Sequence, residues 1–134
     1  MTHSHAATES ATATSTAAKA LRVVSTLAVV FIVLQGVTAG EILSRSKVAL
    51  SLHFDGAIVV HVFTGLTMIA AFLVMRRGSA PRWPTVLAVI VFIVGFVQAA
   101  VGEAGILTIH IPLAMLLLVG SVIVMLWSFW PTRA

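Results

Sequence analysis

The sequence contains no cysteine and few charged residues. Without cysteine, the chain has no disulfide, no thiolate-ligated metal, no iron–sulfur cluster and no CxxC redox motif. Only 9% of its 134 residues are charged and 60% are hydrophobic, whereas about a quarter of the residues in a typical soluble domain are charged. Together with a mean hydropathy of +1.12, this composition excludes an ordinary soluble domain and indicates one small membrane domain.

The common catalytic and nucleotide-binding motifs are also absent from the sequence. It contains no nucleotide-binding loop, no triad pattern and no HExxH, so it identifies no catalytic residue and leaves open whether the protein is an enzyme. The net charge of +4 arises mainly in the segments that flank the apolar runs. This charge therefore indicates membrane topology rather than a nucleic-acid partner.

Four long apolar segments follow a small polar N-terminal stretch. Residues 1–17 have no hydrophobic periodicity and cannot bury enough surface to offset the entropy of ordering, which predicts a disordered tail. Each apolar segment within 18–134 is long enough to cross a bilayer, which takes roughly 20 helical residues. The predicted fold is all-α, a polytopic four-transmembrane-helix bundle with helices over about 21–43, 49–75, 83–103 and 106–130.

The distribution of basic residues predicts how this bundle is oriented. One side of the membrane would carry Lys19, Arg22, Arg76, Arg77, Arg82 and Arg133, and the other side only Arg45 and Lys47. By the positive-inside rule, both termini are then cytoplasmic. The excess of arginine over lysine, together with much alanine and valine, is typical of a GC-rich bacterial genome. We therefore expect a multi-pass protein of the bacterial inner membrane.

The two halves of the chain carry the same short polar pattern. In each half, a helix bearing Gln and then Gly-Glu precedes a turn and a helix that opens with an apolar residue and His. The matching positions are Gln35 and Gln98, Gly40 and Gly102, Glu41 and Glu103, and His53 and His110. The pattern predicts two pseudo-repeated hairpins related by an axis along the membrane normal, although short helical hairpins also coincide by chance.

Polar residues in the predicted helices form two layers. The outer layer, near the outward-facing helix ends, consists of Glu41, His53, Asp55, Glu103 and His110. The inner layer consists of Gln35, His61 and Gln98, which lie roughly 8–12 Å deeper at about 1.5 Å of rise per residue. Closer to the cytoplasm, the sequence is almost purely apolar. Because a proton or ion path needs polar side chains across the whole membrane, this pattern counts against a transporter.

The two outer histidines are the leading candidates for a cofactor or metal site. His53 and His110 open helices that run parallel, so both imidazoles are expected at a similar depth. Two imidazoles that face each other in a helical bundle can ligate a six-coordinate haem b. Two alternatives stay open. In the first, the rings are interfacial side chains that hydrogen-bond to Glu41 or Glu103. In the second, they bind zinc or copper together with these acids or with Asp55.

The inner polar residues complete the set of candidate cofactor-binding side chains. His61 is expected to be a buried neutral ring that hydrogen-bonds to Thr64 or to one of two glutamines. Alternatively, it replaces His53 as an axial ligand. The glutamines, Gln35 and Gln98, are expected to bond across helices, because an unpaired amide in hydrocarbon costs several kcal/mol.

The stretch from Phe96 through Gly102 to His110 resembles the third-to-fourth helix region of one half of a haem A synthase. In that family, a Gln and a Gly in one helix precede a haem-ligating His early in the next, and the stretch from Gln35 to His53 is similar. The family has two four-helix halves, each with a His pair on its second and fourth helices. The resemblance thus implies a haem-holding four-helix fold with His53 and His110 as ligands. The pattern is also similar to small four-helix bacterial membrane proteins.

The sequence departs from that family in several places. It corresponds to one half rather than two, Leu50 stands where the family has a glutamate, and Phe54 replaces an arginine. The cysteine pair of an outer loop is missing as well. The family's oxidation of haem O is therefore not expected here.

These observations predict a small membrane protein that binds one haem b near the outer leaflet. Its function would be one-electron transfer or haem handling, with the outer carboxylates tuning the site and a quinone or a membrane protein partner exchanging the electron. The alternative is a non-catalytic small subunit or scaffold of a larger membrane complex, in which the polar layers serve helix packing alone. The sequence leaves homo-oligomerisation open.

Overall fold

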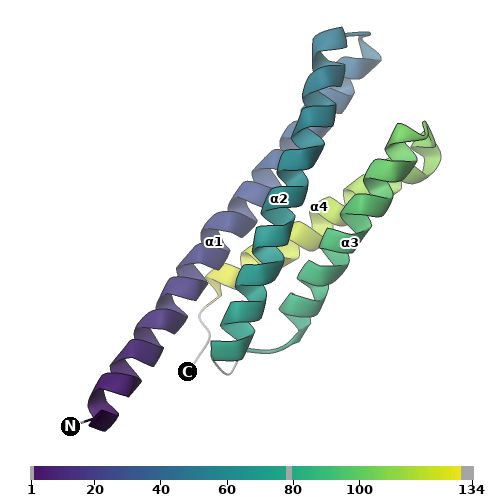
Figure 1. Ribbon diagram of the computed structural model, residues 1–134. Coiled ribbons are helices and arrows are strands. Elements are labelled where there is room, and N and C mark those ends of the chain that lie inside the picture. Colours follow the sequence, from purple (N-terminus) through teal and green to yellow (C-terminus); the bar gives the residue numbers. More distant parts are fainter. Residues whose placement is uncertain (1, 78–79, 131–134) are drawn as a thin grey trace.

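The computed structural model consists of four α-helices arranged as a bundle (Figure 1). The structure describes residues 2–77 and 80–130, with side chains from residue 16 onwards. The helices are α1 (Thr2–Leu43), α2 (Lys47–Arg77), α3 (Trp83–Glu103) and α4 (Leu107–Phe129). The prediction of an all-α fold with four helices is confirmed.

All four helices are long and apolar enough to cross a membrane. The candidate spans are Thr16–Leu43, Lys47–Arg77, Trp83–Glu103 and Leu107–Phe129, with 28, 31, 21 and 23 residues, and roughly 20 residues suffice. The lipid core offers no hydrogen-bonding partner to backbone N–H and C=O groups, so apolar segments of this length adopt the helix, which satisfies these groups internally. The protein is therefore a multi-pass membrane protein.

Local interactions set the helix ends next to the two hairpin loops. α2 begins at Lys47, earlier than predicted, because the Ser46 hydroxyl accepts a hydrogen bond from the Ala49 amide (3.2 Å) and caps the first turn. Gly105, between α3 and α4, has a φ of 73°, in the left-handed region that glycine adopts without steric cost. Arg45 adopts the same region, with a φ of 62°, in the loop between α1 and α2.

Helix α1 extends further towards the N-terminus than the predicted membrane helix. It begins at Thr2, whereas the sequence predicts a membrane helix from residue 21. The side chains of 2–15 lie outside the described residues, so the disordered tail predicted for 1–17 stays a prediction. The described membrane span begins at Thr16.

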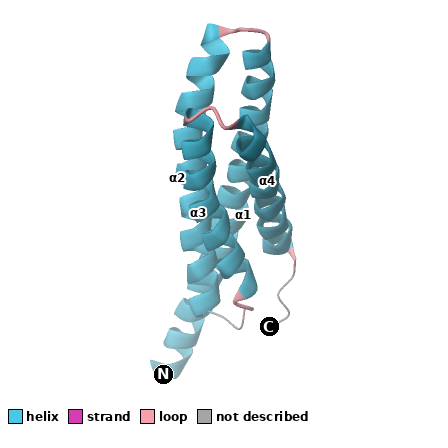
Figure 2. Cartoon of the chain, turned by 90° about the vertical axis from the view of Figure 1, so that its right-hand side faces the viewer, coloured by secondary structure: helices cyan, strands magenta, loops and turns pink. Residues whose placement is uncertain are grey.

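The helices form two antiparallel hairpins that pack side by side (Figures 1 and 2). α1 packs against α2 and α4, and α3 also packs against α2 and α4, so α2 and α4 lie on a diagonal of the bundle. This up-down-up-down order with short loops is a common four-helix topology. The α1–α2 hairpin extends beyond the α3–α4 hairpin at the end that holds the loops 44–46 and 104–106 (Figure 2). We call this end the loop end.

The packed core lies between the middle of the bundle and the end opposite the loop end. One buried cluster draws on all four helices and consists of Ala17, Leu21, Ala70, Ala71, Val74, Ala88 and Val124. A second cluster consists of Ile32, Val60, Val91 and Leu117. Gly120 lets α4 approach α3 closely, because a Cβ at this position would lie 2.7 Å from Cγ2 of Val91. Towards the loop end, most side chains are at least partly exposed, so the helices pack less tightly there.

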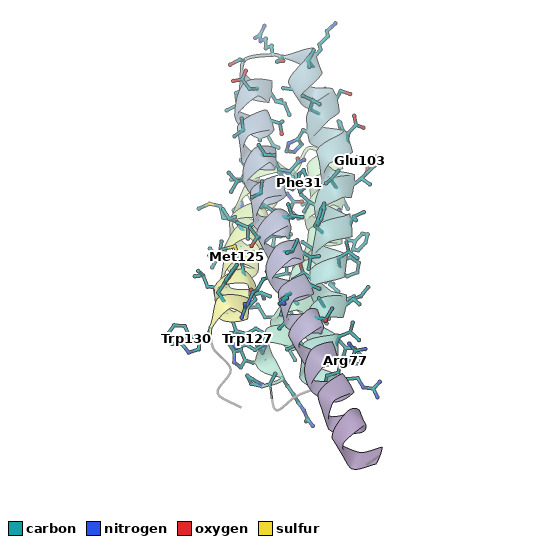
Figure 3. The ribbon with its side chains drawn as sticks, turned by 90° about the vertical axis from the view of Figure 1, so that its left-hand side faces the viewer. Phe31, Arg77, Glu103, Met125, Trp127 and Trp130 are labelled. Atoms are coloured by element: carbon teal, nitrogen blue, oxygen red, sulfur yellow. The ribbon has the colours of Figure 1, made fainter. Side chains whose placement is uncertain are left out.

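The opposite end, which we call the basic end, has the arginine and tryptophan contacts typical of a membrane boundary. Nε of Arg22 on α1 donates to the backbone carbonyl of Ser128 on α4 (2.9 Å). The rings of Trp83 and Trp127 meet edge to face with their centroids 6.0 Å apart. Figure 3 shows Trp127 and Arg77 at this same end. Which side of the membrane it faces stays a prediction.

The interior between these two ends is more polar than predicted. Six buried residues there or close to the basic end carry hydroxyl groups, namely Ser25, Thr64, Thr67, Thr85, Ser121 and Ser128. The expectation of an almost purely apolar sequence on this side of the histidines is therefore wrong for the bundle interior. Single Ser and Thr residues are inconspicuous in apolar helices because they commonly donate to a carbonyl one turn earlier in their own helix. The structure shows that they share the inward face.

Candidate functional site

The structure brings His53 and His110 together near the loop end. His53 lies on α2 and His110 on α4, the two helices on the diagonal of the bundle. Their ring centroids are 6.2 Å apart and their planes are inclined by 63°. Both side chains are half-buried. The pair therefore bridges the two hairpins at the level where the core packing ends.

The His110 ring is held by Gln98 on α3. Its Nδ1 donates to the Gln98 backbone carbonyl (2.9 Å), which fixes the proton of the neutral imidazole on Nδ1 and leaves a lone pair on Nε2. The Gln98 side-chain amide lies 3.4 Å from that Nε2 and is able to donate weakly to it. The expected bonding of Gln98 across helices is therefore present, and its partner is the candidate ligand itself.

The His53 ring is held in a similar way by α1. Its Nδ1 lies 2.9 Å from the Thr38 hydroxyl, and that hydroxyl donates its only proton to the Gln35 carbonyl (3.0 Å). Because the Thr38 proton is committed, Thr38 accepts and His53 Nδ1 donates. Neutral His53 thus carries its proton on Nδ1, and its Nε2 keeps a lone pair.

Both imidazoles are therefore in the state that metal-ligating histidines need. A ligating histidine offers one neutral ring nitrogen to the metal and usually donates the other N–H to a carbonyl, a carboxylate or water, which fixes the ring orientation. Here the Nδ1 donors are occupied by Thr38 and by the Gln98 carbonyl. The arrangement offers two nitrogen ligands, one from each hairpin.

Glycines make room for the polar side chains around the two rings. A Cβ on Gly102 would lie 2.5 Å from Nδ1 and 2.6 Å from Cε1 of His110, so the ring lies directly on the backbone of α3. A Cβ on Gly56 would overlap Nε2 of Gln35, so the Gln35 amide crosses α2 at that residue. Gly40, in contrast, has open space at the Cβ position. Close approach therefore requires glycine at two of these three positions.

The third histidine of the membrane region lies apart from the pair. Nδ1 of His61 donates to the Ala57 carbonyl (2.7 Å), and its ring contacts that of Phe96 with centroids 4.4 Å apart. Its Nε2 is buried, near Gly95, and has no hydrogen-bond partner among the described residues. The expected bond to Thr64 runs instead from the Thr64 hydroxyl to the His61 carbonyl (3.2 Å). His61 thus does not face a second histidine.

The outer carboxylates are not brought to the histidine pair. Glu41, Asp55 and Glu103 are all exposed, and within the described residues the hydrogen bonds of the two rings go to Thr38, to the Gln98 carbonyl and to the Gln98 amide. In the part of the chain that the structure describes, no three His, Cys, Asp or Glu side chains form a group that could hold a metal ion. Zinc or copper bound by two histidines and an acid therefore lacks its third protein ligand.

Sequence reasoning missed Thr38 as a partner of His53. Thr38 lies three residues after Gln35, so both residues share one face of α1. The available signal was a threonine in an otherwise apolar membrane helix, one turn from a glutamine that must face inward. Its contact with His53 depends on the packing of α1 against α2.

Comparisons with protein families, with curated proteins and with solved structures gave no match to this chain.

Proposed function

We propose that this protein binds one haem b between His53 and His110 and uses it for one-electron transfer or haem handling. The observation that carries the proposal is the pair of imidazoles from diagonal helices, both protonated on Nδ1 by their surroundings and separated by 6.2 Å between ring centroids. An isolated pair of interfacial histidines would need neither the common tautomer nor this separation.

The separation of the two rings fits a shared metal ion. His53 and His110 would hold the ion through Nε2, and a centroid separation of 6.2 Å leaves room for two metal–nitrogen bonds of about 2.0–2.1 Å. The number of protein ligands fits as well. The porphyrin supplies four nitrogens to the iron, so two histidines complete a six-coordinate site, whereas a structural zinc site normally takes four protein ligands.

The surroundings of the pair favour a flat macrocycle between the hairpins. Most side chains near the loop end are at least partly exposed, and the two buried core clusters lie elsewhere, so the packing around the pair is loose. The similar anchoring of His53 by α1 and His110 by α3 also supports the proposal that the two hairpins are repeats of one unit.

Haem iron supplies a reversible one-electron couple when bound. The chain's own residues hold the two imidazoles in place. Thr38 and the Gln98 carbonyl keep the Nδ1 protons, which maintains the ligand tautomer and raises the basicity of Nε2. With the basic end on the cytoplasmic side, the site lies near the outer leaflet of a bacterial inner membrane. A quinone or a membrane protein would exchange the electron there.

A reduced-minus-oxidised absorption spectrum of the purified protein tests this proposal. The protein is expressed with haem precursor supplied and extracted in mild detergent, and haem is quantified against protein. We expect one haem per chain and a sharp low-spin b-type α band. His53→Ala and His110→Ala should each abolish this band. The matched control is His61→Ala, on the same helix as His53, which should retain it because His61 faces Phe96 instead.

Two results would contradict the proposal. A colourless wild-type protein that stays monodisperse would leave the small-subunit or scaffold function, and co-purification would then identify the partner. Loss of the band in His61→Ala with retention in His53→Ala would place the ligand on the deeper turn of α2.

A further inference from the structure

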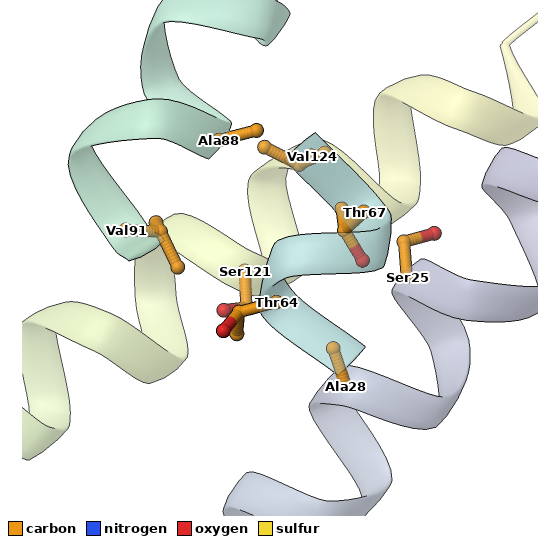
Figure 4. A pocket seen from close by; sticks show the side chains of 8 residues that line it. All are labelled: Ser25, Ala28, Thr64, Thr67, Ala88, Val91, Ser121 and Val124. Carbon is orange, nitrogen blue, oxygen red and sulfur yellow. The ribbon is translucent and has the colours of Figure 1, made fainter. Parts of the chain in front are cut away.

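A small cavity lies in the interior of the bundle, away from the histidine pair. It has a volume of about 10 Å³ and is lined by eight buried residues. They are Ser25, Ala28, Thr64, Thr67, Ala88, Val91, Ser121 and Val124 (Figure 4). All four helices contribute to this lining. Four of the lining residues, on α1, α2 and α4, carry hydroxyl groups, and the other four are apolar.

Three of these hydroxyls have already committed their protons. Thr64 donates to the Val60 carbonyl and Thr67 to the Phe63 carbonyl, each at 2.8 Å. Ser25 donates to the Arg22 carbonyl (3.3 Å), and its oxygen also lies 3.5 Å from the Ser128 hydroxyl. A hydroxyl oxygen that donates its proton still has lone pairs that accept. These three groups therefore present acceptors to the cavity.

Ser121 differs from the other three residues. It is only 5% exposed, and its Oγ is buried with no hydrogen-bond partner among the described residues. The neighbouring Gly120 packs against Val91, which brings α4 close to α3 at this level. Burying a hydroxyl without a partner costs roughly 1–3 kcal/mol. Ser121 thus supplies an uncommitted donor beside three acceptors.

We propose that this cavity is the binding site of one structural water molecule. The volume is near the roughly 10–15 Å³ that a single water requires, and a buried water needs two to four polar partners. The water accepts a hydrogen bond from the Ser121 hydroxyl and donates its two protons to two of the three acceptors on α1 and α2. It thereby links the two hairpins in the membrane interior, independently of any cofactor at the histidine pair.

A serine variant distinguishes a hydrated from a dry cavity by the sign of the effect. With a water present, Ser121→Ala removes one of its partners and lowers the midpoint of unfolding in mixed micelles. In a dry cavity, the same change removes an unpaired hydroxyl and raises the midpoint. The control for the loss of a partnered hydroxyl is Thr85→Val, which should lower the midpoint with or without a water, because the buried Thr85 hydroxyl donates to the Ala71 carbonyl (3.1 Å) and does not line the cavity.

A direct measurement does not depend on stability. In protein with ¹³C-labelled valine methyl groups, we expect cross-relaxation with water at Val91 and Val124, which line the cavity. The control is Val119 on α4, which is 55% exposed on the outer surface and should show none. Cross-relaxation at the cavity methyls that disappears in Ser121→Ala supports the proposal. The absence of cross-relaxation at these methyls in the wild type overturns the proposal, and so does an unchanged or raised unfolding midpoint for Ser121→Ala. A midpoint that depends on sodium at constant ionic strength would indicate a bound cation and also overturn it.

Discussion

Replacing Gly102 by alanine should disturb the histidine site from the backbone side. The new Cβ would lie 2.5 Å from Nδ1 and 2.6 Å from Cε1 of His110, so the ring must move. The movement breaks or bends the hydrogen bond from Nδ1 to the Gln98 carbonyl, now 2.9 Å long. Because this ring is the proposed haem ligand, the same movement should weaken haem binding.

The magnitude follows from three opposing effects. Overpacking costs about 1–3 kcal/mol, and the lost hydrogen bond costs about 0.5–1.5 kcal/mol. The better helix propensity of alanine returns about 0.8–1.0 kcal/mol. The net expectation for Gly102→Ala is a destabilisation of about 0.5–4 kcal/mol.

The matching position in the first half provides the control. A Cβ on Gly40 meets nothing within 4 Å, so Gly40→Ala should gain up to about 1 kcal/mol from helix propensity alone. Unfolding in mixed micelles, followed by the fluorescence of the three tryptophans, measures both variants. The two changes should have opposite signs. Equal effects on stability, or full haem occupancy in Gly102→Ala, would refute the described contact between His110 and α3.

Two other predictions concern the first hairpin and the orientation. Thr38→Val removes the acceptor for His53 Nδ1, so it should shift the midpoint potential of the bound haem and lower the haem occupancy several-fold. Thr38→Ser keeps the hydroxyl and should behave as the wild type. A redox titration in which both variants match the wild type would show that this hydrogen bond has no influence. Because the chain has no cysteine, single cysteines report topology cleanly. A membrane-impermeant maleimide should label Ser46→Cys but not Ala80→Cys in intact spheroplasts, and the reverse pattern would invert the proposed orientation.

Part of the fold follows directly from local sequence. Apolar segments of 21 residues or more can satisfy their backbone in lipid only as helices, and short loops force neighbouring helices to run antiparallel. The turn at Gly105 was likewise predictable, since its left-handed φ of 73° is a conformation that glycine adopts readily. The start of α2 was less predictable, because the Ser46 cap extends this helix beyond its apolar run.

The candidate site was determined only in part by the sequence. The spacing of His53 and His110 in their helices sets their depth, because helical rise is uniform. Which helix faces which is a matter of packing, and only the tertiary structure placed α2 and α4 on a diagonal with the two rings 6.2 Å apart. The same packing selected Thr38 rather than a carboxylate as the partner of His53. It also placed Ser121 and the other hydroxyl groups around one cavity. The physical reason is that contacts between helices depend on how each helix is rotated about its own axis, and an evenly apolar sequence does not determine this rotation.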